Sequence, residues 1–509
     1  MAGTLRAEAA EEGGMGQARR WIEWMDAWIL PWRQMVDNIL TKRTLFIFFA
    51  LVSRHRSDVV GCAQPSERSA RRIAQPIPSV LASDATPRCA SMASADRQMI
   101  GDATLGPTAA STGKTHAMNS QNFNGLEALT RLRQDIHRHP ELAFEERRTA
   151  GIVAAYLHSL GIEVHTEVGR TGVVGVIPGK TNRSQRSIGL RADMDALAMP
   201  DHKPVPHRST CEGVMHGCGH DGHTAMLLGA AAELARTRAF DGTVVLIFQP
   251  AEEGAGGAKA MLDDGLLERF PVESFWGLHN WPGVPLGQAV IHATACMAAV
   301  DYFDIDVLGK GCHGGMPQEG IDAVLAAAHI VTALQSIPAR NVHPLDSAVV
   351  GVAKIHGGQA YHVGPEVVTL SGSVRAHKES VRALVEHRLH EVAENAAAAL
   401  GAKVRIRYQR NYPATVNDPA LADIASEVAA SVLGAEKVVR DRLPSMAAED
   451  FSFFSRERPG CYVWMGNDDA DHIMSLHHPK YDFNDRLIGH GMAYWTRLVS
   501  RVLPVAPHL

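Results

Sequence analysis

Residue types that commonly bind metal ions are concentrated in the stretch MHGCGHDGHTAMLLGA, which begins at Met215. Cys218 and His220 are separated by one residue, so on a loop both side chains can converge on one ion. Thiolate and imidazole ligands together suit Zn²⁺ or another late divalent metal. Two other interpretations are open at this point: Cys218 as a nucleophile with a histidine as its base, and an incidental cluster. For Asp221 we expect capping of the helix that follows.

Two adjacent carboxylates form a second group. Glu252 and Glu253 follow the apolar segment 243–248 and precede GAGGA, a backbone that can approach another group closely. Neighbouring side chains at the end of a strand point in different directions, so one can bind a metal while the other faces a substrate. A metal hydrolase needs this division, because one carboxylate binds the ion and the other takes a proton from water. The pair therefore favours a hydrolytic metal site.

Further histidines that could complete such a site lie later in the chain. His279 is part of WGLHNWPG, and His477 and His478 are part of SLHHPKYDFND. Taken alone, His279 could equally be a packed histidine of the core. Cysteine, histidine and glutamate together make a soft-to-borderline ligand set that is large enough for two ions.

The segments around these motifs alternate between helix-like and strand-like patterns. We expect helices near 126–139, 152–160 and 222–237, and strands at 172–177, 187–192, 243–248 and 274–280. This alternation indicates an α/β domain with a mixed, largely parallel sheet flanked by helices. Ligands of such sheets bind beyond the carboxyl ends of the strands. RADMDA, QPAEEG and LHNW all lie at such ends.

The middle of the chain has a different order of elements. Its pattern predicts strands at 301–308, 347–355, 366–376 and 403–410 and helices at 321–337 and 379–400. The resulting order, β-α-β-β-α-β, is that of a ferredoxin-like domain. We therefore expect residues 298–411 to be inserted into a catalytic domain made of 118–297 and 412–509. Residues 1–117 lack a sustained period, and we expect a poorly ordered extension there.

The composition of the 509-residue chain disfavours several classes of partner. A net charge of −5 gives no bulk attraction to nucleic acid or to an anionic membrane. The apolar run 45–52 is far shorter than the roughly 20 residues that span a bilayer. Seven cysteines, an odd number spread along the chain, indicate a reducing compartment, so we expect a cytoplasmic protein.

Six segments in order resemble the M20 metallopeptidase family: RADMDALAMP, MHGCGHDGHTAMLLGAA, PAEEGAGGAKAML, GLHNWP, GKGCHGGMP and LHHPKYDFND. The resemblance covers roughly 118–505. Within the family it is to the branch of hippurate hydrolases, N-acyl-amino-acid amidohydrolases and indole-acetyl-amino-acid hydrolases. It implies a metal-dependent exopeptidase-like fold for the catalytic domain.

The resemblance also implies a site with two metal ions. The implied ligands are Cys218, His220, Glu253, His279 and His477. Glu252 matches the general base, and Asp195 matches an acid that orients a ligand imidazole. His216, His223 and His478 are not ligand positions in this pattern. The ion could be Mn²⁺ or Zn²⁺, and Co²⁺ or Ni²⁺ would suit the same ligands.

For the inserted domain, the resemblance implies a lid through which many members form dimers. His313 matches a residue that reaches the scissile carbonyl, commonly from the partner subunit. Asn341 and Arg375 match positions that contact the carboxylate side of the substrate, for which a bidentate guanidinium is well suited. The loop around His313 departs from the usual GGHGAMPH, since Cys312, Gly315 and Gln318 differ. This departure leaves the identity of the acyl group open.

The implied function is metal-dependent hydrolysis of the amide bond of an N-acyl-amino acid such as hippurate, which gives a carboxylic acid and a free amino acid. Glu252 would be the general base, and His313 would help to stabilise the oxyanion. The expected partners are this small substrate and a second copy of the chain. A dipeptidase or aminopeptidase of the same family is the nearest alternative. A cysteine hydrolase that uses Cys218 and a non-catalytic metal-binding protein are the other two.

Overall fold

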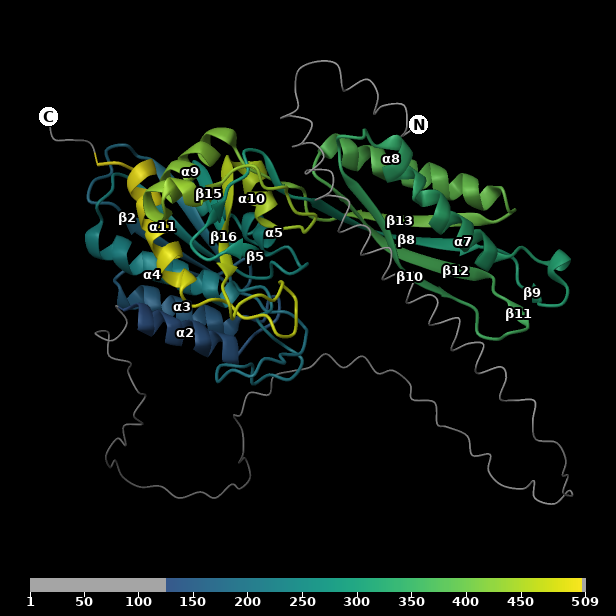
Figure 1. Ribbon diagram of the computed structural model, residues 1–509, viewed down its shortest axis with the longest axis horizontal. Coiled ribbons are helices and arrows are strands. Elements are labelled where there is room, and N and C mark those ends of the chain that lie inside the picture. The colour runs from purple at the N-terminus through teal and green to yellow at the C-terminus, as the bar shows by residue number, and fades with distance from the viewer. Residues whose placement is uncertain (1–124, 506–509) are drawn as a thin grey trace, which may run out of the picture. The chain divides into compact units, whose positions relative to one another are not determined.

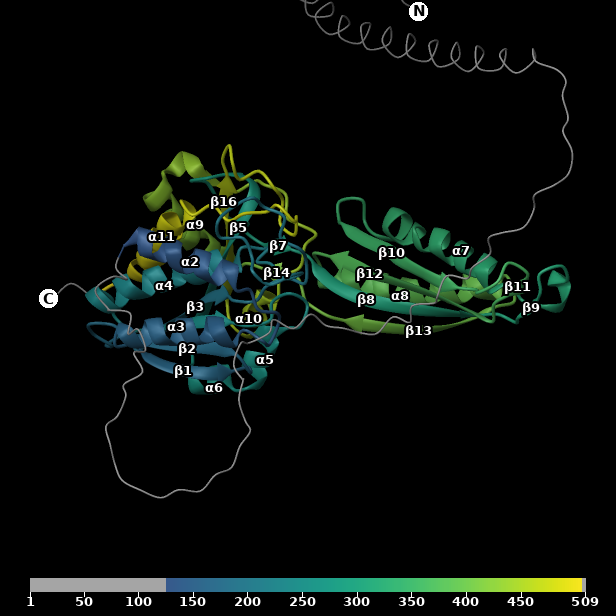
Figure 2. The ribbon, with the colours of Figure 1, turned by 90° about the horizontal axis from the view of Figure 1, so that it is seen from below.

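The computed structural model describes residues 125–505. The extension expected at 1–117 and the apolar run 45–52 lie outside these residues. Within 125–505, no helix is long and apolar enough to cross a membrane. The described residues contain two main sheets, which Figure 1 and Figure 2 show as separate layers with helices packed on them.

The central sheet has eight strands in the order β1-β2-β4-β3-β5-β16-β6-β15. Their bounds are β1 (Glu163–Val168), β2 (Gly172–Pro178), β3 (Ser187–Asp193), β4 (Thr243–Gln249), β5 (Ser274–Pro285), β6 (Ala289–Val290), β15 (Val438–Val439) and β16 (Gly460–Asp468). The central pairs β4-β3, β3-β5 and β5-β16 are parallel, as is β6-β15, whereas β1-β2, β2-β4 and β16-β6 are antiparallel. The expectation of a mixed, largely parallel sheet is confirmed.

Helices cover both faces of this sheet, and β4 shows why its sequence is apolar throughout. Val244, Leu246 and Phe248 belong to the core on one face, and Val245 and Ile247 belong to the core on the other. Because successive side chains of a strand point to opposite faces, a strand that is buried on both sides must be apolar at every position.

The first face packs against α2 (Leu126–Arg138), α3 (Arg147–Ser159), α4 (His220–Thr237), α9 (Pro419–Leu433) and α11 (Leu487–Val502). The second face packs against α5 (Gly257–Asp263), α6 (Leu266–Arg269) and α10 (Phe451–Glu457). Figure 2 shows α3 lying along β1 and β2. The expected helices and strands of this domain are all present, and β5 runs past His279 to Pro285 because β16 continues to pair with it there.

The second sheet is antiparallel, in the order β10-β12-β8-β13. Its strands are β8 (Ala299–Leu308), β10 (Ala348–Gly357), β12 (Val367–Ala376) and β13 (Lys403–Arg410), and its helices are α7 (Ala323–Leu334) and α8 (Glu379–Ala398). The order of elements is the expected β-α-β-β-α-β. We call this part the inserted domain. Its apolar core is separate from those of the central sheet, because α7 and α8 pack on one face of these four strands.

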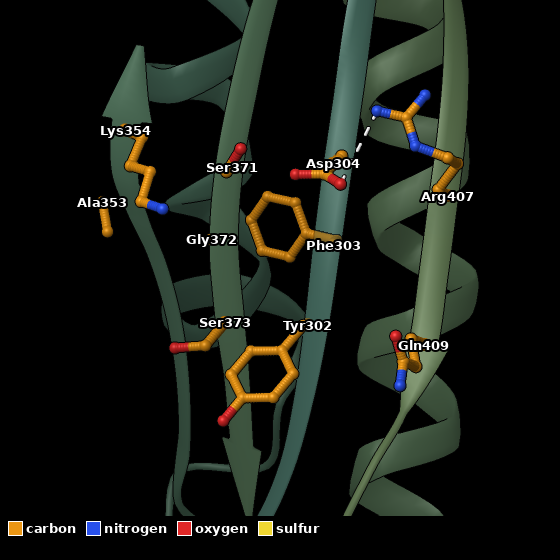
Figure 3. Close-up of a pocket in the computed structure, with 10 residues that line it drawn as sticks. All are labelled: Tyr302, Phe303, Asp304, Ala353, Lys354, Ser371, Gly372, Ser373, Arg407 and Gln409. Atoms are coloured by element: carbon orange, nitrogen blue, oxygen red, sulfur yellow. Dashed lines mark ion pairs between the residues drawn. The ribbon is translucent and has the colours of Figure 1, made fainter. Parts of the chain in front are cut away.

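The other face of the inserted sheet carries a hollow of about 490 Å³ (Figure 3). Residues of all four strands line it, among them Tyr302, Asp304, Lys354, Ser373 and Arg407. None of the residues predicted to perform chemistry lies in this hollow.

Shorter elements connect the two sheets and extend the inserted domain. They are β7 (Ala295–Met297) paired with β14 (Thr415–Val416), β9 (Cys312–His313) paired with β11 (Val363–Gly364), and the short helical segments η3 (Pro317–Glu319) and η4 (Ile337–Asn341). A further single turn, η5 (Ala435–Lys437), joins α9 to β15.

Candidate active site

The five predicted metal ligands lie close together beyond the carboxyl ends of the central strands. Their donor atoms fall into overlapping groups in which all atoms lie within 4.8 Å of one another: Cys218 with His220 and His279, and Cys218 with Glu253 and His477. Cys218 comes from the loop that leads into α4, His220 is the first residue of α4, and Glu253 comes from the turn after β4. His279 lies just past Gly277, the last residue of β5 that pairs with β3. The sheet therefore assembles the cluster where the strand ends predicted it.

Two of the imidazoles are held with one nitrogen toward the cluster. His220 Nδ1 is 3.1 Å from Asp195 Oδ1, and the second oxygen of Asp195 accepts a hydrogen bond from the backbone N–H of Glu253. His279 Nδ1 is 2.5 Å from the carbonyl oxygen of Asn280, which leaves its Nε2 at 3.3 Å from Cys218 Sγ. Hydrogen bonding of one ring nitrogen to a carboxylate or carbonyl is the usual support of a metal-binding histidine.

His477 completes the cluster from the loop that follows β16. Its Nε2 is 3.2 Å from Glu253 Oε1, and its backbone N–H donates to the carbonyl of Gly217. About half of its side chain is exposed, unlike the other members. The neighbouring His478 uses Nδ1 to accept the backbone N–H of Lys480 and is absent from the donor groups of the described residues.

The other histidines of the opening motif have different surroundings. Both ring nitrogens of His223 are hydrogen-bonded, Nδ1 to Asp193 at 2.6 Å and Nε2 to the side chain of Asn280 at 2.7 Å. His216 is fully buried, and burial lowers its pKa to about 3. A neutral, enclosed imidazole of this kind contributes packing.

The prediction that Asp221 caps α4 is wrong. The helix begins at His220 with Gly219 as its N-cap, a left-handed residue at φ 95°, and there is no side-chain cap. The carboxylate of Asp221 instead accepts hydrogen bonds from His137 at 2.8 Å and Arg133 at 3.3 Å. Although burial opposes ionisation, the interactions with His137 and Arg133 hold the pKa of Asp221 well below its usual value. The carboxylate of Asp221 therefore contacts buried side chains and does not cap α4.

Glu252 lies beside the cluster and is almost fully buried. It shares a group of nearby donor atoms with His220 and Glu253. One of its oxygens accepts the backbone N–H of Asp450 at 3.3 Å. Burial raises its pKa well above the usual value, and the negative charges of Glu449 and Glu253 add to the effect. A carboxyl group with an elevated pKa is suited to exchange protons with a substrate.

The donor set fits divalent cations. His220 Nε2 and Glu253 Oε1 are buried and make no hydrogen bond among the described residues, although His477 Nε2 lies 3.2 Å from Glu253 Oε1. Burial by itself would lower the pKa of His220, but Asp193 and Asp195 raise it to about 10. The cluster therefore attracts positive charge, and unpaired buried polar atoms are rare unless a ligand satisfies them.

The same surroundings disfavour Cys218 as a nucleophile. The thiol is buried, and burial together with Glu253 and Glu252 raises its pKa well above the usual value. Reactive cysteines instead lie in electropositive surroundings that lower the pKa of the thiol.

Comparison with known proteins agrees with this geometry. Residues 189–501 match the model of the peptidase family M20/M25/M40. The chain belongs to this family. A hippurate hydrolase of Campylobacter jejuni is 40% identical over 73% of this M20 chain and 96% of its own length. An N-acetyl-L-cysteine deacetylase of Bacillus subtilis is 36% identical over 73% and 87%. An IAA-amino acid hydrolase of Arabidopsis thaliana, ILR1-like 4, is 38% identical over 73% and 85%.

Solved structures resemble this M20 chain as well. YXEP of Bacillus subtilis, a dinuclear metal-binding peptidase of the M20 family, superposes with a TM-score of 0.65 at 33% identity, over 74% of this chain and 98% of that one. The aminobenzoyl-glutamate utilization protein of Klebsiella pneumoniae superposes with a TM-score of 0.54 at 26% identity, over 75% and 96%.

Sequence reasoning missed three acids of the M20 site: Asp193, Glu449 and Asp450. Glu449 and Asp450 form a donor group with Glu252, and Asp193 forms one with His220 and His223. All three accept hydrogen bonds from the buried guanidinium of Arg191, at 2.7 Å from Asp193, 2.9 Å from Glu449 and 3.2 Å from Asp450. The signal was available, because AAEDF places adjacent acids before an apolar run, just as PAEE places them after one.

The three predicted residues of the inserted domain are in different surroundings, and His313 belongs to none of the donor groups of the described residues. His313 is exposed on β9, opposite Val363 of β11, and its Nδ1 accepts the backbone N–H of Gly315. Asn341 ends η4 and accepts a hydrogen bond from Arg388 at 3.3 Å. Arg375 on β12 is opposite Val300 and donates to the carbonyl of Met446 at 3.2 Å, so its tip contacts the catalytic domain.

His313 and Arg375 lie at opposite ends of the inserted sheet. Arg375 is paired with Val300 near the start of β8, whereas His313 follows Leu308, where β8 ends. A rise of about 3.3 Å per residue puts Val300 and Leu308 roughly 26 Å apart. Figure 1 shows β9 and β11 at the end of this sheet. One small substrate molecule therefore cannot contact both side chains of the same subunit.

Proposed function

We propose that this M20 protein hydrolyses the amide bond of N-acyl-amino acids, with Glu252 as the general base. The observation that carries the proposal is the position of this buried carboxyl group beside five converging cysteine, histidine and glutamate donors. The names of the relatives, a hippurate hydrolase and an N-acetyl-L-cysteine deacetylase, point to the same substrate class.

Cys218, His220, Glu253, His279 and His477 would hold the metal. When bound, divalent ions supply Lewis-acid activation of water and of the amide carbonyl. Glu252 takes the proton of the attacking water and delivers it to the leaving amine. Asp195 keeps His220 and the backbone of Glu253 in place through its two hydrogen bonds.

We propose two ions per subunit, Mn²⁺ or Zn²⁺, with Co²⁺ or Ni²⁺ as substitutes. The set of one thiolate, three imidazoles and one carboxylate is of borderline softness, which suits late divalent metals. The number of ions is supported by the number of donors and by the dinuclear relative YXEP.

We also propose that the working unit is a homodimer, or a larger homo-oligomer, in which the inserted domain is the lid. His313 would then act on the oxyanion at the site of the partner subunit, while Asn341 and Arg375 bind the carboxylate of the substrate. Arg375 pairs with Val300, and His313 follows Leu308. The roughly 26 Å between these two ends of β8 supports this arrangement. We also propose that the protein is located in the cytoplasm.

The nearest alternative is a dipeptidase, because a dipeptide differs from an N-acyl-amino acid mainly by a free amino group. The test compares kcat/KM for hippurate, N-acetyl-amino acids and the dipeptides with the same C-terminal residue. The proposal requires faster hydrolysis of the acylated compounds. Faster hydrolysis of the dipeptides would assign the chain to the alternative.

A further inference from the structure

Tyr412 connects the inserted domain to the turn that carries Glu252. Its hydroxyl donates a hydrogen bond to the backbone carbonyl of Glu252 at 2.8 Å and accepts one from the backbone N–H of Gly256, also at 2.8 Å. The side chain is 3% exposed, and its ring packs edge-on against Phe453. One hydroxyl thus bridges both ends of the turn 252–256.

Backbone groups on either side of Glu252 are held from within the catalytic domain: the N–H of Ala251 donates to Glu146 at 2.9 Å, and the N–H of Glu253 donates to Asp195 at 2.9 Å. Ala251 and Gly254 both have positive φ, 55° and 83°, which is unfavourable for the alanine. The carbonyl of Glu252 accepts one further hydrogen bond, from Gly254 within the turn. The contact with Tyr412 is therefore the one that ties the carbonyl of Glu252 to the segment that leaves the inserted domain.

The backbone of Tyr412 lies where the chain returns from the inserted domain. The N–H of Val300 donates to the carbonyl of Tyr412 at 3.0 Å, and the N–H of Asn411 donates to the carbonyl of Val300 at 3.2 Å. Val300 is on β8, the strand by which the chain enters the inserted domain, and it also pairs with Arg375 of β12. Tyr412 thus links the two segments that connect the domains, one entering and one leaving the inserted domain, to the turn of Glu252.

We propose that Tyr412 is a positioning residue: it couples the placement of the inserted domain to the placement of the Glu252 carboxylate. This inference rests on the proposed role of Glu252 as the base. Burial and the nearby charges of Asp450 and Glu252 raise the pKa of Tyr412, so the phenol stays protonated and remains a donor. A displaced inserted domain would pull the hydroxyl from the turn and misalign the base.

The test is Tyr412→Phe in the full-length, metal-loaded protein. We expect kcat on hippurate to fall about tenfold, as for the loss of one buried hydrogen bond, with KM and metal content unchanged. The matched control is Tyr408→Phe, which removes the hydroxyl that donates to Asp301 at 2.7 Å on the same return strand but does not contact the turn. It should leave kcat unchanged.

A double variant separates positioning of the base from a general effect. If Tyr412 acts through Glu252, Tyr412→Phe has no further effect in a Glu252→Gln background. A repeated fall of about tenfold there, or a change in KM or metal content in place of kcat, would overturn the inference. So would an equal loss of kcat in Tyr408→Phe.

Hydrogen exchange of the Gly256 amide supplies a readout that needs no activity. We expect it to be faster in Tyr412→Phe than in the wild type and Tyr408→Phe. If the wild type hydrolyses no amide, the proposed function fails, and this exchange alone decides whether the contact holds the turn. An unchanged exchange rate would overturn the inference.

Discussion

The catalytic domain and the inserted domain hold their predicted site residues in different ways. In the catalytic domain, His220, Glu252 and His279 are buried, and each is hydrogen-bonded to a second group. In the inserted domain, His313 is exposed and its hydrogen bond is to its own loop. The central sheet thus brings its half of the site together before substrate binds, whereas in our proposal the other half depends on the placement of the inserted domain and of a partner subunit.

The difference follows from the position of each residue in its sheet. The ends of the central parallel strands bring acids and histidines together in one dry place, where each needs partners to offset its desolvation. Arg191 serves three acids there at once. His313, on the short strand β9, is exposed instead, and its hydrogen bond is to the backbone of Gly315 two residues away.

The largest effect expected is that of Glu252→Gln. Because in our proposal this residue accepts the proton of the attacking water, kcat should fall by roughly 10³-fold or more. The metal content, measured on the purified protein, should stay that of the wild type. A variant that loses its metal together with its turnover would make Glu252 a ligand, and the division between base and ligand would be wrong.

His313→Ala tests whether the second half of the site comes from another subunit. Loss of an oxyanion donor should lower kcat by about 10²-fold without loss of metal. Mixing this variant with Glu252→Gln should restore activity, up to about a quarter of the wild type with random exchange, because mixed dimers contain one intact site. If the subunits exchange and activity does not recover, His313 either acts at the site of its own subunit or takes no part in the reaction.

Asp195→Asn tests the part of the site that the central sheet holds in place. An amide cannot accept hydrogen bonds at both positions, so it cannot hold both His220 and the backbone of Glu253. We expect a metal affinity that is roughly 10- to 100-fold weaker and turnover that recovers at high metal concentration. The control is Asp263→Asn, an exposed residue of α5 paired with Lys259, for which both quantities should be those of the wild type. Equal affinities in the two variants would remove Asp195 from the site.

Arg375→Lys should give the smallest effect of the four. A lysine keeps the charge but loses the bidentate fork, so we expect KM to rise about tenfold with little change in kcat. Arg407→Lys, in the hollow of Figure 3 on the same sheet, is the matched control and should change neither. A lower kcat at unchanged KM would assign Arg375 a role other than binding the substrate carboxylate.

Hydrophobic periodicity predicted most of the fold because β4 and its neighbours are buried on both faces and read as unbroken apolar runs. β1 (Glu163–Val168) was not predicted, since EVHTEV is an edge strand with mostly exposed, polar side chains. β6 and β15 have two residues each, too few for any period.

The resemblance to the M20 family assigned the residues now seen around Cys218, whereas the residues alone had left His279 open as a core histidine. These residues meet because loops at neighbouring strand ends converge regardless of their separation in sequence. The spacing could not show which acid does what. Asp221 resembles a helix cap in the sequence, yet its carboxylate is turned toward His137 by a buried ion-pair network. Asp193 was passed over for Asp195 because only the folded sheet shows Arg191 and His223 beside it.

The most direct test of the account is a chelate-and-restore assay with hippurate. Exhaustive removal of metal should abolish hydrolysis, and Mn²⁺ or Zn²⁺ should restore it in wild type but not in Glu252→Gln. Alkylation of the metal-loaded protein should be slow, since the Cys218 thiol is buried among carboxylates. Hydrolysis that survives complete removal of metal and disappears on alkylation would contradict the account and favour a cysteine hydrolase.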